Sequence, residues 1–306
     1  MKHTALIYFV LIGLLTACSG GGQNGKKQLI SQLERSGSNL DRDSIQSLKK
    51  ATMSYLEEEE ITEEDKSKAL YHFGLMLDRN RKFNDAAIAM KNLVIEYPKS
   101  AYVEDALYSL INIYKVKLRS PKVSAVLSDY LISINPEHEK KEELDGNIPD
   151  DYKGADDVLL NLREASLVQQ EDGNVRVDRK NAKNLIFLSQ MYANFRPEGE
   201  NAKEHLHNAA EFARSIADNE ELLNILNVLI DEYPDSKQGQ EALFLKAFYY
   251  ENNLKDEEGA RALYEKFIEK YPENDFADDA EFLLKNIGKS EEEILREFEE
   301  RQKEQQ

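Results

Sequence analysis

Apolar and polar positions recur along the chain in a short phrase: an apolar helix end, an aromatic residue, a proline, and an alanine eight residues after the proline. The clear copies contain Tyr97-Pro98, Tyr233-Pro234 and Tyr271-Pro272, followed by Ala106, Ala242 and Ala280. Looser copies end at Pro136 and Pro197. From Pro98 onward these prolines are separated by 38, 61, 37 and 38 residues. Self-similarity at a period in the thirties predicts an all-α array of helix pairs.

Within one period the apolar spacing predicts two helices, here called helix A and helix B. For the unit that ends at Pro98, large residues fall on both helices and small residues fall where the helices approach each other. The large positions are Leu70, Phe73, Leu77, Met90 and Leu93, and the small ones are Gly74 and Ala86. The unit ending at Pro272 fits with one extra residue in its inter-helix loop, through Leu243, Ala247, Tyr250, Ala260, Tyr264 and Phe267. The unit ending at Pro136 departs, with Ser124 and Ser128 at pattern positions.

The period is broken once, between the units that end at Pro136 and Pro197. Residues 137–177 are rich in acidic side chains and contain Gly146, Pro149 and Gly154, which favours a linker or exposed loop with one short helix inside it. Ser290 and Glu293 form a capping-box pattern at the start of a charged terminal helix. The predicted divisions are a signal peptide at 1–17, a flexible tether at 18–42, an N-terminal helical-repeat block at 43–136, an acidic linker or insertion at 137–177, a C-terminal helical-repeat block at 178–288 and a charged helix at 289–306. Within the tether a short helix is expected near residues 27–35, and the N-terminal block begins with a first helix at 43–58.

The composition and charge of the chain argue against some classes of partner. Charged residues make up 32% of the 306 positions and the formal net charge is −18. Binding to the phosphate backbone of nucleic acids needs a cationic surface, so this acidity argues against nucleic acid as a partner. It equally disfavours a protein that lies flat on anionic lipid.

The first residues are typical of an exported protein. Residues 5–15 form an apolar run that is too short to span a bilayer and fits the hydrophobic region of a secretory signal. The segment Leu15-Thr16-Ala17-Cys18 that follows resembles the lipobox of bacterial lipoproteins, which implies lipidation of Cys18, the only cysteine. The alternative is an ordinary signal peptide with a free cysteine beside its cleavage site. Ser19, rather than Asp, follows the cysteine, which by the same resemblance favours the outer membrane, on its periplasmic leaflet. The residues after the cysteine are Ser-Gly-Gly-Gly-Gln and not the acidic residues of surface-exported lipoproteins, which disfavours the cell surface.

Motifs for catalysis, metals and cofactors are not found in the sequence. It contains no Gly-rich phosphate loop, no nucleophile elbow and no HExxH motif. His205 and His207 stand two residues apart, which places them on different faces of a helix and disfavours a shared metal ion. We therefore expect no cofactor, no metal and no enzymatic activity.

The repeat phrase resembles the tetratricopeptide lipoproteins of the bacterial envelope. The similar families are the BamD-type lipoproteins of outer-membrane β-barrel assembly and the repeat domain of the CpoB family, which is associated with Tol-Pal and cell division. The resemblance covers about residues 67–136 and 178–288, and the long acidic segment departs from the BamD pattern. It implies a tetratricopeptide-like superhelix and a scaffold that binds a protein partner of the envelope. The alternative is an extracytoplasmic lipoprotein that binds a glycan or nutrient, which the absence of Trp disfavours.

In a tetratricopeptide array, helix A of each pair lines the inner groove. Counting back from the closing prolines, aromatic or histidine rings occupy the fifth pattern position of helix A: Tyr71, Tyr108, His207 and Phe244. The ninth position holds Leu75, Asn112, Glu211 and Phe248. One interpretation is that Tyr71, Leu75, Tyr108, His207, Phe244 and Phe248 form a partner-binding groove. The other is that the rings pack between successive A helices.

Overall fold

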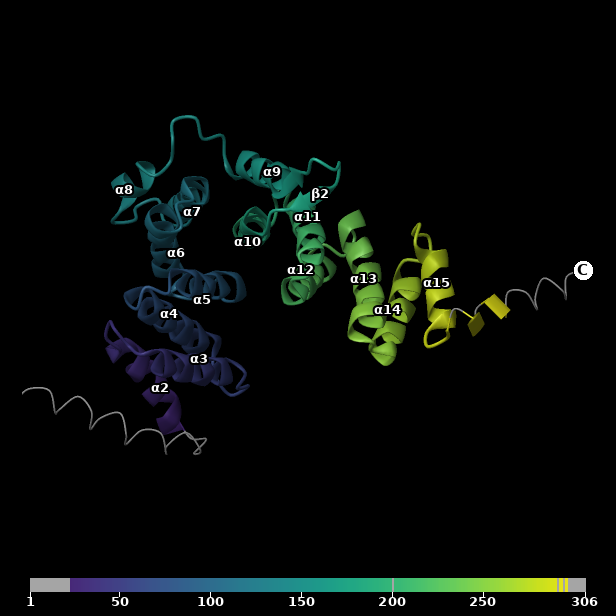
Figure 1. Cartoon of the computed structure of the whole chain (residues 1–306), viewed down its shortest axis with the longest axis horizontal. Helices are drawn as coiled ribbons and strands as arrows, with labels where there is room; N and C mark the ends of the chain where they lie inside the picture. The colour runs from purple at the N-terminus through teal and green to yellow at the C-terminus, as the bar shows by residue number, and fades with distance from the viewer. Residues whose placement is uncertain (1–22, 200, 291, 294, 297–306) are drawn as a thin grey trace, which may run out of the picture. The chain divides into compact units, whose positions relative to one another are not determined.

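The structure is a computed structural model and describes residues 23–199, 201–290, 292–293 and 295–296. Its contacts divide the chain between Gly154 and Ala155 into two units, and each unit is described by itself. The first contains α2 (Gln23–Arg35), α3 (Arg42–Leu56), α4 (Glu63–Arg79), α5 (Phe83–Glu96), α6 (Val103–Asn112), the π-helical turn η1 (Ile113–Lys117), α7 (Pro121–Ile134) and α8 (Lys141–Asp145) (Figure 1).

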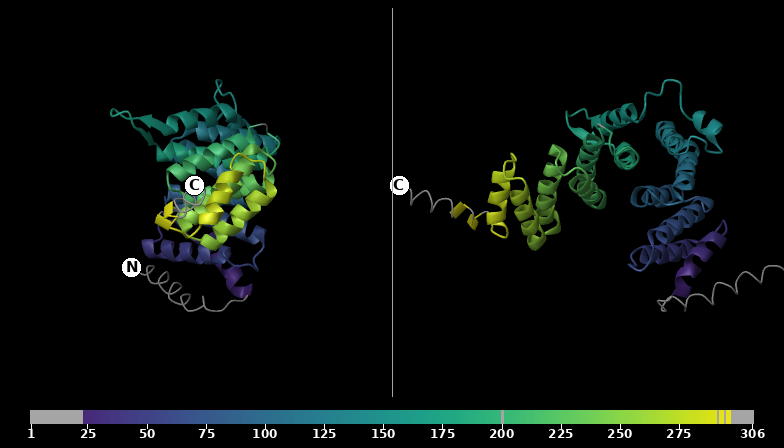
Figure 2. Two further views of the ribbon diagram at one scale, coloured as in Figure 1. Left: turned by 90° about the vertical axis from the view of Figure 1, so that its right-hand side faces the viewer. Right: turned by 180° about the vertical axis from the view of Figure 1, so that it is seen from behind.

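The second unit begins with a helix and a two-stranded hairpin and continues as stacked helices. Its elements are α9 (Ala155–Ser166), β1 (Leu167–Gln169), β2 (Val175–Val177), α10 (Arg179–Phe195), α11 (Ala202–Ser215), α12 (Asn219–Glu232), α13 (Lys237–Tyr249), the π-helical turn η2 (Tyr250–Leu254), α14 (Glu257–Lys270) and α15 (Ala277–Asn286). Helices α11 to α15 lie side by side in chain order when seen from the front and from behind (Figures 1 and 2). The hairpin aside, the regular elements of the described residues are helical, which confirms the all-α helical-repeat fold.

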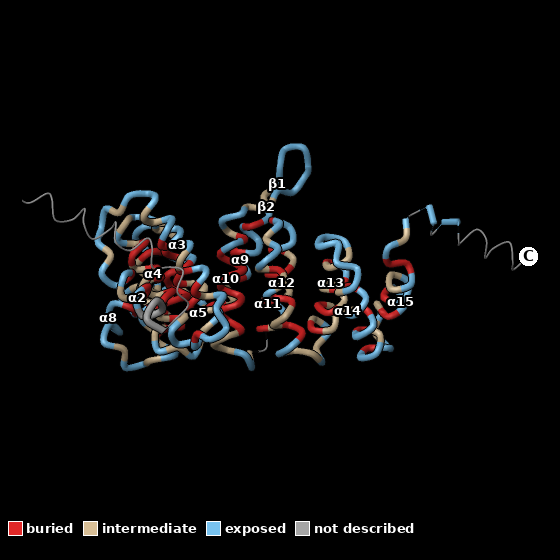
Figure 3. The backbone as a smooth tube through the Cα atoms, turned by 90° about the horizontal axis from the view of Figure 1, so that it is seen from below, coloured by how far each residue is buried: buried red, intermediate tan, exposed pale blue. Residues whose placement is uncertain are grey.

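The helix pairs have the core that the spacing predicts. In the α4–α5 pair the predicted large positions Leu70, Phe73 and Leu77 are buried. A Cβ atom built on Gly74 would lie 2.7 Å from Cε of Met90 on the facing helix, so the small residue is needed for close approach. In the α13–α14 pair the predicted positions are likewise buried, apart from Tyr250, which is half-buried. Figure 3 shows the buried residues on the facing sides of the helices in each unit.

The recurrent Tyr-Pro phrase joins one repeat to the next. The hydroxyl group of Tyr233 donates to the carbonyl oxygen of Pro197 at 3.1 Å, and that of Tyr271 donates to the carbonyl oxygen of Pro234 at 2.8 Å. Each tyrosine therefore satisfies a carbonyl group in the preceding copy of the phrase, where the proline has ended helix B. These two inter-repeat hydrogen bonds therefore recur at the same spacing as the Tyr-Pro phrase.

The turn from helix A to helix B is also repeated. A non-glycine residue in the left-handed region stands two positions before each helix B of four pairs: Arg81, Arg119, Ala217 and Lys255. In two turns the closing bond is Lys82 N–H to Leu77 O and Asp218 N–H to Ala213 O, both at 2.9 Å. In the two π-ended pairs it spans one residue more, from Ser120 to Tyr114 and from Asp256 to Tyr250. The extra residue predicted in the loop before α14 is therefore absorbed as η2, at the end of helix A.

The expected flexible tether at 18–42 differs from the structure over its described part. Helix α2 contacts α3 and α4, and its Leu29, Ile30 and Leu33 are buried. The apolar stripe of this helix is short and is surrounded by Gly, Ser and Lys, which is why composition alone indicated a linker. The first helix predicted at 43–58 is found as α3.

The expected linker at 137–177 is also largely structured. Helix α8 packs on α7, and the remaining part from Ala155 onward packs with the second unit. Helix α9 lies along α10, so it is helix A of the pair that ends at Pro197. The hairpin β1–β2, paired antiparallel with Leu167 opposite Val177, is inserted in the turn between the two helices and is mostly exposed (Figure 3). This insertion lengthens the turn between α9 and α10, so the pair does not have the spacing of the other repeats in the sequence.

The capping box predicted at the start of the terminal helix is confirmed. The backbone N–H of Ser290 donates to Oε2 of Glu293 at 2.8 Å, and the backbone N–H of Glu293 donates to Oγ of Ser290 at 3.3 Å.

Candidate functional site

The predicted groove positions lie on the exposed side of the A helices α4, α6, α11 and α13, within their respective units. The rings of the fifth position are half-buried, because each packs against a residue shortly before or near the start of the helix that follows helix B in its unit. Three ring pairs, with their centroid distances, are Tyr71–Tyr102 at 5.4 Å, Tyr108–His138 at 6.1 Å and Phe244–Phe276 at 4.9 Å. His207 faces Glu241 with 3.9 Å between Nδ1 and Oε2.

These contacts give the fifth-position rings a packing role between successive repeats. Phe244 stacks on Phe276 and also contacts Tyr264 and Phe267, so it belongs partly to the core of the last repeat. Tyr108 donates its hydroxyl hydrogen to Glu143 of α8 at 2.9 Å. The structure thus places Tyr71, Leu75 and Tyr108 on the first unit and His207, Phe244 and Phe248 on the second.

The ninth position is more open in the second unit. Leu75 of α4 is half-buried, whereas the ring of Phe248 on α13 is 43% exposed. One helical turn separates Phe248 from Phe244 on the same face of α13. Phe248 is therefore the predicted groove residue with the largest ring surface available to a partner.

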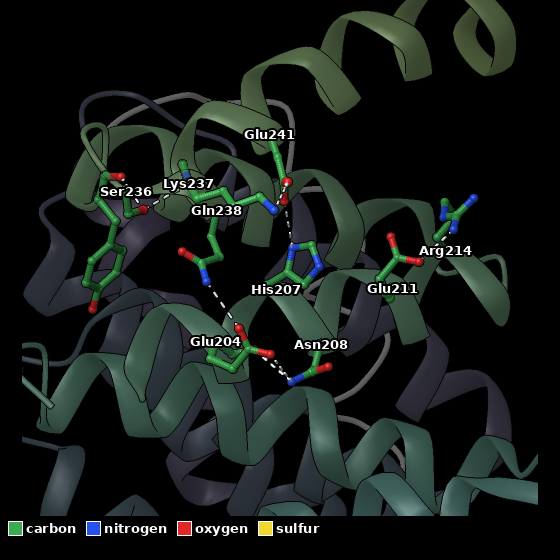
Figure 4. A network of polar contacts seen from close by, with 11 residues as sticks. Glu204, His207, Asn208, Glu211, Arg214, Ser236, Lys237, Gln238 and Glu241 are labelled. Carbon is green, nitrogen blue, oxygen red and sulfur yellow. Dashed lines mark hydrogen bonds and ion pairs between the residues drawn. The ribbon is translucent and has the colours of Figure 1, made fainter. Parts of the chain in front are cut away.

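Next to this aromatic face, α11 and α13 form a polar network (Figure 4). Glu241 lies 3.5 Å from the Lys237 ammonium as well as facing His207. Glu204 accepts from the side-chain amides of Asn208 at 3.3 Å and Gln238 at 3.1 Å. Further along α11, Glu211 pairs with Arg214 at 2.6 Å, away from Glu204 in Figure 4. The network therefore contains more carboxylates than lysine and arginine side chains.

A second polar cluster connects α9, α10 and α11. Nε2 of His205 lies 2.8 Å from Oδ1 of Asp156, and because a carboxylate only accepts hydrogen bonds, Nε2 carries the proton. Asn201 donates to the same oxygen at 3.0 Å, and the hydroxyl group of Tyr192 donates to Oδ2 at 3.3 Å. The rings of Tyr192 and His205 meet edge to face at 4.9 Å.

The electrostatics of this cluster favour an ionised carboxylate. Burial alone raises the pKa of Asp156, but the hydrogen bonds from His205, Asn201 and Tyr192 outweigh burial and hold the pKa below its ordinary value. Asp156 therefore stays negatively charged at neutral pH while it holds three side chains from two neighbouring helices. The cluster fixes the start of α9 against α10 and α11.

A pocket of about 250 Å³ opens beside this cluster. Its lining consists of Asp156, Leu159, Leu160, Arg163, Leu185, Asn201, Glu204, His205 and Asn208. None of these lining residues carries a hydroxyl or thiol group that a histidine–aspartate pair could activate as a nucleophile. The pocket has an apolar part made by leucines and a polar part with two carboxylates, an arrangement suited to binding.

Sequence reasoning interpreted His205 only as a surface or structural histidine and missed Asp156. The signal that could have found them is the phrase itself: eight residues after Pro197 stands His205, where other repeats have Ala106, Ala242 and Ala280. Asp156 could not be placed, because the hairpin hides α9 as a repeat helix.

The remaining predictions concern metals and the membrane. Cys18, the predicted lipidation site, lies outside the described residues. Across the described ranges no group of three or more His, Cys, Asp or Glu side chains is arranged to hold a metal ion. Within the same ranges no helix has the length and apolar character needed to cross a membrane.

Comparison with known proteins agrees with the fold. The fold is an all-α helical repeat of tetratricopeptide-like form, and one of its helix pairs matches a family model. The match is to the tetratricopeptide repeat and covers residues 241–274, which include most of α13 and the whole of α14. No curated protein matches the chain. Repeats of this type generally mediate protein–protein interaction and are typically scaffolds without enzymatic activity.

Proposed function

We propose that this protein is a lipid-anchored scaffold of the bacterial envelope that binds a protein segment along the helix A face of its second unit. The observation that carries the proposal is the exposed ring of Phe248, beside the packed ring of Phe244 and the polar network of α11 and α13. An aromatic anchor bordered by polar groups is the usual composition of a protein-binding surface.

The charge of the chain indicates the kind of partner. With a net charge of −18, long-range attraction favours a basic segment and accelerates its encounter with the protein. A helix or an extended segment can both dock on a helix A face, using apolar side chains against Phe248. The resemblance to BamD-type and CpoB-type repeats suggests outer-membrane protein assembly or division coordination as the process served.

The membrane anchor is part of the proposal. Leu15-Thr16-Ala17-Cys18 supports diacylation of Cys18 and attachment to the periplasmic face of the outer membrane. Two acyl chains suffice for stable anchoring. A Cys18→Ser variant should lose metabolic palmitate labelling and leave the outer-membrane fraction. A wild-type protein without palmitate label would contradict the anchor.

The binding surface is tested with a matched pair of exposed apolar residues. Phe248→Ser removes the proposed anchor, and Leu254→Ser removes a side chain of similar exposure (47%) at the end of η2. Partners that co-purify from detergent-solubilised membranes are compared by quantitative mass spectrometry. We expect one protein to be lost from Phe248→Ser and kept by Leu254→Ser, with unchanged helicity in both. Equal recovery from both variants would contradict the proposed surface.

A further inference from the structure

The pocket beside Asp156 contains two carboxylates, Asp156 and Glu204, that form no ion pair with a lysine or arginine in the described part of the chain. Asp156 accepts from Asn201, Tyr192 and His205, and Glu204 accepts from Asn208 and Gln238. An ionised carboxylate has about four acceptor sites. Both groups therefore retain charge and hydrogen-bonding capacity.

The rest of the lining matches a side chain that is apolar along its stem and charged at its tip. Leu159, Leu160 and Leu185 line the pocket from α9 and α10. Leu159 and Leu185 are buried, whereas Leu160 is 51% exposed although it is a large aliphatic residue. Lysine and arginine bury their methylene stems on such surface while the charged head stays at a polar rim. A volume of about 250 Å³ is of side-chain size and below the range of typical small-molecule pockets, about 300–1,000 Å³.

We propose that this pocket binds the cationic side chain of a lysine or arginine carried by the partner segment. The inference rests on the proposed function, because the partner is what brings the side chain to the face of α9 and α11. Asp156 and Glu204 pair with the cation, and the leucines pack against its stem. Arg163, exposed and also part of the lining, opposes a second cation. Removing the charge of Arg163 should therefore strengthen binding of the cation, whereas removing the charge of Glu204 should weaken it.

The test uses small probes, so it does not depend on finding the partner. The full chain in detergent, labelled with carbon-13 at the histidine Cε1 position, is titrated with N-acetyl-arginine methylamide. The neutral analogue with citrulline and the acidic analogue with glutamate are titrated in parallel. We expect a saturable shift of the His205 resonance with the arginine probe and a clearly weaker response to the other two.

Three variants locate the charge effect. Glu204→Gln should weaken binding of the arginine probe about two- to fivefold, and Arg163→Gln should strengthen it by a similar factor, the range for one partly exposed ion pair. Glu211→Gln is the control, because it changes the net charge as Glu204→Gln does, on the same helix, but outside the pocket. It should leave the affinity unchanged.

Several results would overturn the assignment: no saturable shift with arginine, equal binding of citrulline, tighter binding of glutamate, or equal weakening by Glu211→Gln and Glu204→Gln. Failure of the proposed function appears differently. Arginine binding to the pocket together with full partner recovery by Phe248→Ser would leave the pocket in place and refute the binding face on α13.

Discussion

Gly239 lies where the end of α12 touches the first turn of α13, and Gly239→Ala should disturb this contact. A Cβ atom at Gly239 would collide with the carbonyl oxygen of Tyr233 and lie 2.8 Å from that of Leu229. Both atoms belong to the backbone, so neither can rotate away. The corresponding positions five residues after the other closing prolines carry Val103, Lys141, Ala202 and Ala277, and the helices there start at those residues. Helix α13 starts two residues earlier, at Lys237, so residue 239 lies inside its first turn. Glycine is needed there because a side chain would meet the backbone at the end of α12.

The cost follows from what α13 would lose by starting later. The N-cap bond from Gly239 N–H to Oγ of Ser236, at 3.0 Å, would be lost at about 1 kcal/mol. The backbone bond from Gln240 to the Ser236 carbonyl, also at 3.0 Å, adds about 1 kcal/mol. A total of about 2 kcal/mol lies within the usual cost of overpacking, about 1–3 kcal/mol. For a chain of this size it lowers the midpoint of thermal unfolding by roughly 4–8 °C.

Gly74→Ala is the matched control. There the added methyl group would meet only the side chain of Met90, which is flexible and can move. Alanine also has higher helix propensity than glycine by about 1 kcal/mol, which offsets part of the clash. Thermal unfolding followed by circular dichroism at 222 nm should show a clearly larger loss for Gly239→Ala. Equal midpoints for the two variants would refute the close approach of α12 and α13.

Three further substitutions test other parts of the structure. Ser189→Ala should stabilise the protein by about 1 kcal/mol, because the buried hydroxyl of Ser189 has no hydrogen-bond partner and alanine favours helix. Ser124→Ala is the control and should not gain stability, because the hydroxyl of Ser124 donates to a backbone carbonyl at 3.3 Å. Ala217→Gly should raise the free energy of unfolding in urea by up to about 1 kcal/mol, since it removes left-handed strain at φ 53°; a loss would contradict the turn geometry. The pKa of Asp156 is lowered in the fold, so its contribution to stability is complete above the ordinary carboxyl range and is lost as pH falls through the folded-state pKa. Asp156→Asn should therefore flatten the decline of the melting midpoint below about pH 5. An unchanged pH profile in that variant would contradict the role given to the His205 cluster.

The parts of the fold that repeat could be predicted from the sequence, because each copy places a proline, an aromatic residue and small helix-crossing residues at fixed spacing. Gly74 and Ala260 were found in this way. Helix α9 was missed as a repeat helix because the hairpin inserted before α10 displaces it in the count. The short helix expected near residues 27–35 is part of α2, but its packing was not expected, because its buried stripe comprises only Leu29, Ile30 and Leu33.

The candidate site was predicted less completely, for a physical reason. The fifth position of helix A was expected to face solvent, but its rings are half-buried, because exposure there depends on what the next repeat contributes. Tyr102 and Phe276 cover Tyr71 and Phe244 in this chain, and no rule of periodicity specifies those partners. The bonds of Asp156 to His205 and Asn201 connect residues more than forty positions apart, so they could be seen only in the folded chain.

Site-specific photocrosslinking in living cells tests the central claim most directly. A photoreactive phenylalanine analogue is placed at position 248 on helix A and, in a second strain, at position 265 on the exposed side of helix B in the same pair. We predict a discrete crosslinked protein from position 248, lost when excess unlabelled wild-type protein is co-expressed, and none from position 265. The same products from both positions, or products from position 265 alone, would contradict a partner held on the helix A face.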